Sequence, residues 1–151
     1  PWKFLVVRDR ARLDALAERA EDAYMRRYLE ADRPGDPAEV RRRVAQALDG
    51  ALSAPVYIAV LADREAPYPE YVVQDATLAA GNLMNAARAL GYGTGFFTTF
   101  FPDEVMRPFF DIPERYTVVC FTPLGVPEAW PDTPPKKPLE ELVIEGGFSG
   151  R

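Results

Sequence analysis

The sequence contains no histidine and only one cysteine, Cys120. The absence of histidine excludes a Ser-His-Asp triad and a Cys-His pair, and with a single cysteine it also excludes the common kinds of zinc site. One cysteine permits no disulfide within the chain, which is typical of proteins of the reducing cytoplasm. We therefore predict a cytoplasmic protein without a metal site. If it is an enzyme, its chemistry must come from carboxylates, lysines or a bound cofactor.

Long apolar runs and long basic runs are also lacking. No window approaches the roughly 18 uninterrupted apolar residues of a membrane span, so the sequence predicts a soluble protein with no membrane partner. The net charge is −5 and the longest basic run is Arg41 to Arg43, which argues against a nucleic-acid partner. The 151 residues suffice for one ordinary domain, and we predict a single domain over 1–151.

The hydrophobic pattern predicts one sheet covered by helices, in an α+β or α/β sandwich. Short apolar runs predict strands at 3–7, 54–63, 94–100 and 115–125, the first of them buried. Apolar positions at three- and four-residue steps predict helices at 8–31, 38–50, 71–91 and, more briefly, 102–110. Asp36 is expected to cap the second helix, with Pro37 at its first position. The remainder, 126–151, is rich in proline and predicts an extended arm lying on a surface.

The helix predicted at 71–91 is apolar or small nearly all round, which is typical of a buried helix. Gly81 in its middle costs about 1 kcal/mol relative to alanine, so it predicts the close approach of another element. This helix could cross the core, a twofold dimer interface, or both.

Three glycines at alternate positions, Gly91, Gly93 and Gly95, follow that helix. A dinucleotide-binding fingerprint needs Gly-x-Gly-x-x-Gly after a strand and before a helix, and here the order is reversed, so a phosphate loop is excluded. We expect Gly91 to be the residue that ends the helix and Gly93 to lie in a turn. Gly95 and the Phe-Phe-Thr-Thr that follows could lie edge-on to a flat ligand and donate N–H groups to it, or form an ordinary buried strand. Spacing alone leaves both interpretations open.

Five stretches, taken in order, resemble the FMN-dependent nitroreductase family of NAD(P)H:flavin and nitro oxidoreductases. They are "PWKFLVVRDR", "APVYIAVLAD", "DATLAAGNLMNAARALGYGTGFFTTF", "IPERYTVVCFTPLGVPE" and "PPKKPLEELV". The resemblance covers nearly the whole chain. It implies an α+β three-layer sandwich, with a central mixed sheet flanked by helices, in a homodimer. The family's N-terminal segment, with its phosphate clamp and Asn/Ser-rich loop, has no counterpart here, and we expect residues upstream of Pro1.

The resemblance also implies FMN in a cleft at the dimer interface, bound by both subunits. The implied contacts are the end of the flavin loop, a strand facing the flavin edge that carries N5 and O4, and a basic pair at the ribityl phosphate. These are, in that order, Pro1 and Trp2; Phe97, Thr98 and Thr99; Lys136 and Lys137. Some members carry an acidic residue and a glycine in place of the two threonines, so a backbone donor is what this chain retains. The lysines could also be solvated tail residues, and the tryptophan could be core packing.

The implied activity is hydride transfer from NAD(P)H through the flavin to a small planar acceptor such as a nitroaromatic or a quinone. No side chain is expected to act as a catalytic acid or base. Two alternatives stay open: a catalytically silent dimeric module that binds flavin or another planar ligand, and a truncated inactive homologue. The colour of the protein and its response to NADPH would separate the three.

Overall fold

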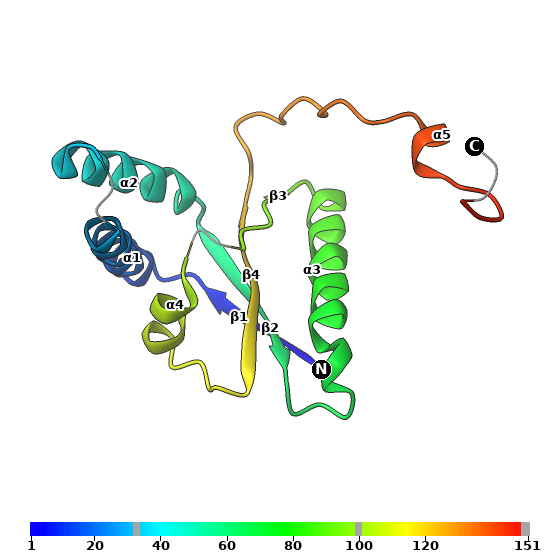
Figure 1. Ribbon diagram of the computed structural model, residues 1–151, viewed down its shortest axis with the longest axis horizontal. Coiled ribbons are helices and arrows are strands. Elements are labelled where there is room, and N and C mark those ends of the chain that lie inside the picture. Colours follow the sequence, from blue (N-terminus) through cyan, green and yellow to red (C-terminus); the bar gives the residue numbers. More distant parts are fainter. Residues whose placement is uncertain (32–33, 99–100, 149–151) are drawn as a thin grey trace.

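The computed structural model describes residues 1–31, 34–98 and 101–148, and Figure 1 shows their arrangement. The elements, in chain order, are β1 (Trp2–Val7), α1 (Arg10–Glu30), α2 (Pro37–Ala51), β2 (Val56–Asp63), η1 (Pro69–Tyr71), α3 (Val72–Ala89), β3 (Gly93–Thr94), α4 (Asp103–Phe109), β4 (Tyr116–Gly125) and α5 (Leu139–Leu142). This order confirms the predicted alternation of strands and helices. None of the helices in these ranges combines the length and the apolarity needed to cross a bilayer.

The four strands form one sheet in the order β1-β2-β4-β3. All three pairings are antiparallel, so the mixed sheet that we expected is wrong for the described strands. The connection between the first two strands explains part of this. Val7, at the end of β1, lies opposite Tyr57 near the start of β2, because α1 and α2 lead the chain back to the end of the sheet that it has just left.

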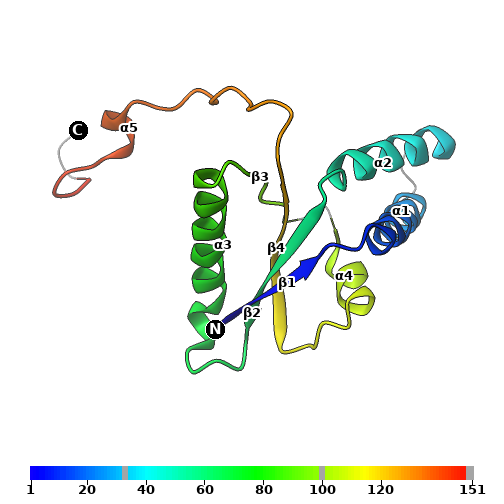
Figure 2. The same ribbon diagram turned by 180° about the vertical axis from the view of Figure 1, so that it is seen from behind.

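Helices cover both faces of the sheet, which confirms the α+β three-layer sandwich. Figures 1 and 2 show α3 on one face and α1, α2 and α4 on the other. Alternate residues of β2 and β4 face opposite layers, as the pleat requires. Tyr57 and Phe121 pack towards α1, α2 and α4, whereas Val60 and Cys120 pack towards α3. The Tyr57 and Phe121 rings stack at 5.0 Å, and Phe101 meets Phe121 edge-on at 5.3 Å.

Local signals in the sequence place two helix ends correctly. The Asp36 carboxylate accepts a hydrogen bond from the Ala38 amide at 3.0 Å, and Pro37 is the first residue of α2. Gly91 has φ +84°, and its amide donates to the Arg88 carbonyl at 3.1 Å. The Tyr92 amide donates to the Ala87 carbonyl at 2.8 Å. The end of α3 therefore has the two hydrogen bonds that are typical of a helix terminated by glycine.

The strand predicted at 94–100 is wrong in length. β3 consists of Gly93 and Thr94 alone, followed by a single bridge from Phe97 to Phe121 of β4. The register places Gly95 opposite Pro123, which has no N–H to donate, so the ladder is interrupted at that point. Thr99 and Phe100 lie outside the described residues.

The expected burial of β1 is wrong, and the element expected to approach Gly81 is not found within the described part of one chain. β1 is an edge strand, and Trp2, Phe4 and Val6 are each 44–46% exposed. A Cβ built on Gly81 would meet nothing within 4 Å, so no element of the same chain approaches that position. α3 packs on Val60, Ala62 and Cys120 of the two central strands, and its side at Gly81 has open space within the described residues.

Candidate functional site

The residues to which we assigned flavin contacts lie on opposite edges of the sheet. Pro1 and Trp2 lie at the start of β1, whereas Phe97 and Thr98 follow β3. Because β2 and β4 lie between these two strands, the edges are about 14 Å apart at the usual spacing of neighbouring strands. One chain therefore does not bring the two groups together.

In the segment after β3, Phe97 is hydrogen-bonded to the sheet and its neighbour Thr98 is exposed to solvent. The Phe97 carbonyl accepts a hydrogen bond from the Phe121 amide at 2.9 Å, which holds this segment to the sheet. Gly95 leaves room for the Phe97 ring, since a Cβ at Gly95 would lie 3.0 Å from that ring. Thr98 is exposed and makes no hydrogen bond to any other described residue, so its N–H and hydroxyl can serve a ligand. The third predicted residue of this group, Thr99, lies outside the described residues.

The predicted phosphate-binding lysines lie on the arm that follows β4, which we define as residues 126–148. Every residue from Glu128 to Phe148 is exposed, so the described part of its own chain does not bury the arm, and the surface on which we expect it to lie stays a prediction. Figures 1 and 2 show it bending across the C-terminal end of α3 and continuing beyond the helix. Lys137 pairs with Glu141 at 3.5 Å, whereas Lys136 makes no ion pair within the described ranges.

A band of exposed apolar side chains lies on the α3 side of the molecule. On β1 it comprises Trp2, Phe4 and Val6, which alternate with Leu5 and Val7, the residues that pack towards the opposite layer. On α3 it includes Val73 and Leu78, which are 47% and 69% exposed. We call these five exposed residues the α3–β1 face. Exposed apolar side chains that gather on one side of a protein are typical of interaction sites.

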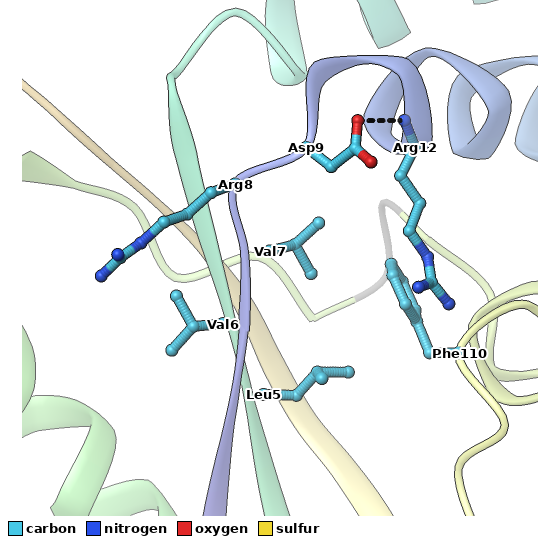
Figure 3. Close-up of a pocket in the computed structure, with 7 residues that line it drawn as sticks. All are labelled: Leu5, Val6, Val7, Arg8, Asp9, Arg12 and Phe110. Carbon is cyan, nitrogen blue, oxygen red and sulfur yellow. Dashed lines mark hydrogen bonds between the residues drawn. The ribbon is translucent and has the colours of Figure 1, made fainter.

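Two cavities of the described surface lie away from the predicted flavin residues. One, of about 270 Å³, adjoins the end of β1 and is drawn in Figure 3. There the Arg12 guanidinium lies over the Phe110 ring at 5.3 Å and donates to the Phe109 carbonyl at 3.3 Å, and the Asp9 carboxylate accepts from the Arg12 amide. The other, of about 320 Å³, lies between α1 and α2. Neither is lined by a predicted flavin residue, so neither supports a flavin site within one chain.

The titratable groups offer little chemistry of their own. Burial raises the pKa of the Cys120 thiol to about 11, so this cysteine stays protonated at neutral pH and is a poor nucleophile. The Arg115 guanidinium lowers the pKa of Asp63, which it bonds at 2.6 Å in an exposed pair. Within the described ranges no three carboxylate or thiol groups converge as metal ligands would.

Comparisons with known proteins identify the class to which this sandwich belongs. The model of the nitroreductase family matches residues 1–126, and the chain therefore belongs to the nitroreductase family. A Methanothermobacter thermautotrophicus protein, provisionally named NADH dehydrogenase/NAD(P)H nitroreductase, is 31% identical over 137 residues. That alignment covers 88% of this chain and 59% of the relative, so the chain spans little more than half the length of the curated relative.

Solved structures share the fold. A crystal structure from Bacteroides thetaiotaomicron, under the same provisional name, is 26% identical with a TM-score of 0.65, and covers 96% of this chain and 72% of that one. Iodotyrosine deiodinase, solved with FMN and 3-iodo-L-tyrosine, is 21% identical with a TM-score of 0.71. The match covers 98% of this chain and 77% of the deiodinase. At this identity the likeness shows the fold alone.

Proposed function

We propose that the protein is an FMN-dependent oxidoreductase that works as a homodimer and holds its flavin between two copies of the chain. One observation carries this proposal. Two groups of predicted flavin residues, Pro1 with Trp2 and Phe97 with Thr98, lie on opposite sheet edges about 14 Å apart, and a second chain could place a β1 edge beside the segment after β3. Membership of the nitroreductase family supports the choice of FMN.

The donor groups fit FMN. At the flavin ring, the open N–H and hydroxyl of Thr98 would face the edge that carries N5 and O4, where they would orient the ring. At the ribityl phosphate, Lys136 and Lys137 would supply two positive charges that attract the dianion. Prolines on both sides of this pair, Pro135 and Pro138, limit the freedom of the lysine backbone.

The exposed surfaces fit a second copy. The α3–β1 face is apolar, and at Gly81 the outer side of α3 has room for another backbone to approach. The arm carries Leu139, Leu142 and Ile144, which are 41–71% exposed, so the described residues of its own chain do not bury them. In the proposed dimer these side chains cross to the partner subunit, which would bury apolar area on both sides.

The chemistry would come from the cofactor and the geometry from the chain. Bound FMN would supply the hydride chemistry between NADH or NADPH and a second substrate. The chain would fix the flavin at Thr98 and at the two lysines, and the dimer cleft would exclude water from one ring face. No acid or base side chain is required, because water or the acceptor can supply protons. The acceptors that suit such a cleft are flat and electron-poor, such as nitroaromatics, quinones and similar compounds.

Anaerobic spectroscopy tests the proposed function. The protein, reconstituted with FMN, should be yellow, lose its flavin absorbance on addition of NADPH or NADH, and recover it when a nitroaromatic or a quinone is added. A Thr98→Ala variant should keep its rate within about threefold, because the backbone donor survives. Bound flavin that neither nucleotide reduces would instead indicate a binding module. Protein that takes up no flavin would indicate an inactive homologue.

A further inference from the structure

The arm is tied to the body of the protein at two points near its base. The Pro127 ring packs on Gly93 of β3, where an added Cβ would lie 3.4 Å from the ring atoms. Three residues later, the Arg88 guanidinium lies over the Trp130 ring, 3.3 Å from its centroid. Beyond Trp130 the arm is exposed throughout its described length. The base of the arm is therefore held, and the rest of it projects (Figure 1).

Arg88 is well placed to be the fixed partner of this stack. It lies in the last turn of α3, where a cation is favoured by the helix dipole. Its backbone belongs to a helix packed on the sheet through Val72, Ala76 and Ala80, so it has little freedom to move. A guanidinium over an indole is the strongest common cation–aromatic pair. Trp130 therefore takes its position from α3.

The segment beyond Trp130 is stiff enough for the position of Trp130 to influence where Lys136 lies. Five residues lie between Trp130 and Lys136, and Pro131, Pro134 and Pro135 are among them. A proline-rich segment favours the extended polyproline conformation, at about 3.1 Å per residue, so the six steps from Trp130 to Lys136 span about 19 Å. When a stiff segment is held at one end, the orientation of that end decides where the other end lies.

We propose that Arg88 and Trp130 are a positioning pair that directs the arm so that Lys136 and Lys137 reach the phosphate of FMN. This inference rests on the proposed function, and it assigns no flavin contact to either member of the pair. Arg88 acts through Trp130, and Trp130 acts through the proline-rich segment. Loss of the stack leaves both lysines intact and lets the arm sample directions in which they miss the phosphate.

Titration of the flavin-free protein with FMN and with riboflavin tests the positioning pair. Trp130→Ala and Arg88→Gln should each weaken FMN binding about threefold to tenfold, the size expected of a cation–aromatic contact. Riboflavin has no phosphate, so its affinity should stay unchanged. Trp130→Phe, which keeps a ring under the guanidinium, should restore most of the FMN affinity. The double variant should be no weaker than either single variant, because both changes remove the same contact.

A distance measurement on the flavin-free protein gives a second readout. Spin labels at Gln74→Cys on α3 and Thr133→Cys on the arm, diluted with unlabelled protein, should give a narrow distance distribution that Trp130→Ala broadens. An unchanged distribution, or equal FMN affinity in Trp130→Ala and the parent protein, would overturn the positioning pair and leave the proposed function standing. A parent protein that binds no FMN would overturn the proposed function, and the positioning pair with it.

Discussion

Replacing Lys136 and Lys137 together by alanine should weaken FMN binding about 100-fold and leave riboflavin binding within about twofold. Each hydrogen bond to a charged partner contributes about 1.5–3 kcal/mol, and about 1.4 kcal/mol corresponds to a tenfold change in affinity. The two single variants should differ. Lys137 is already paired with Glu141, so Lys136→Ala should have the larger effect.

Quenching of flavin fluorescence on binding would measure both affinities, with Arg42→Ala on α2 as the control. Arg42 is exposed and its replacement removes one positive charge, as each single lysine variant does, but it lies on the layer opposite α3. The FMN affinity of the double variant should also depend less on salt concentration, because two of the charges that attract the phosphate are gone. Equal losses for FMN and riboflavin would mean that the lysines do not recognise the phosphate.

Replacing Phe121 by alanine should lower the free energy of unfolding by about 3–5 kcal/mol, as expected for a large buried ring. Phe121 is 2% exposed, and its ring contacts the rings of Tyr57 and Phe101. Its amide also holds the Phe97 carbonyl. Phe121 is the bridge partner of Phe97, which precedes Thr98, so we expect flavin affinity to fall along with stability.

Urea denaturation followed by circular dichroism would measure the loss, with Leu29→Ala as the control. Leu29 is 60% exposed on α1, and alanine is a good helix former, so this change should cost about 0.5 kcal/mol or less. A Phe121→Ala protein as stable as the Leu29→Ala protein would contradict the core described above.

The strands and helices that were predicted well have short-range signals. The central strands predicted at 54–63 and 115–125 differ by at most two residues from β2 and β4, because a continuous run of β-branched and aromatic residues is typical of a strand buried on both faces. The start of α2 follows from Asp36 and Pro37, which act on their own neighbours. The end of α3 follows in the same way from Gly91.

The predictions that were wrong depend on distant parts of the chain. The strand at 94–100 is shortened by Pro123, which lies on the neighbouring strand and has no signal in the local pattern. The exposure of β1 and the open space beside Gly81 depend on which strands α3 covers. Helical spacing in the sequence does not determine that. The mixed sheet was taken from the family resemblance, and the described strands do not form one.

The candidate site was predicted less completely than the fold. The seven flavin residues rest on the resemblance, and they stay predictions. The contact between Arg88 and Trp130 joins residues 42 positions apart, and no motif in the sequence indicates it. The structure adds the positions of these residues. Two groups of predicted residues lie on opposite edges of the sheet, the α3–β1 face is exposed, and the arm projects from the body of the protein.

Light scattering combined with flavin absorbance tests the shared site most directly. The protein reconstituted with FMN should elute as a particle of two chains with one flavin per chain. Leu78→Asp, which places a charge in the α3–β1 face, should give a monomer that has lost its flavin. A monomer that keeps one tightly bound FMN per chain would contradict a flavin held between two copies.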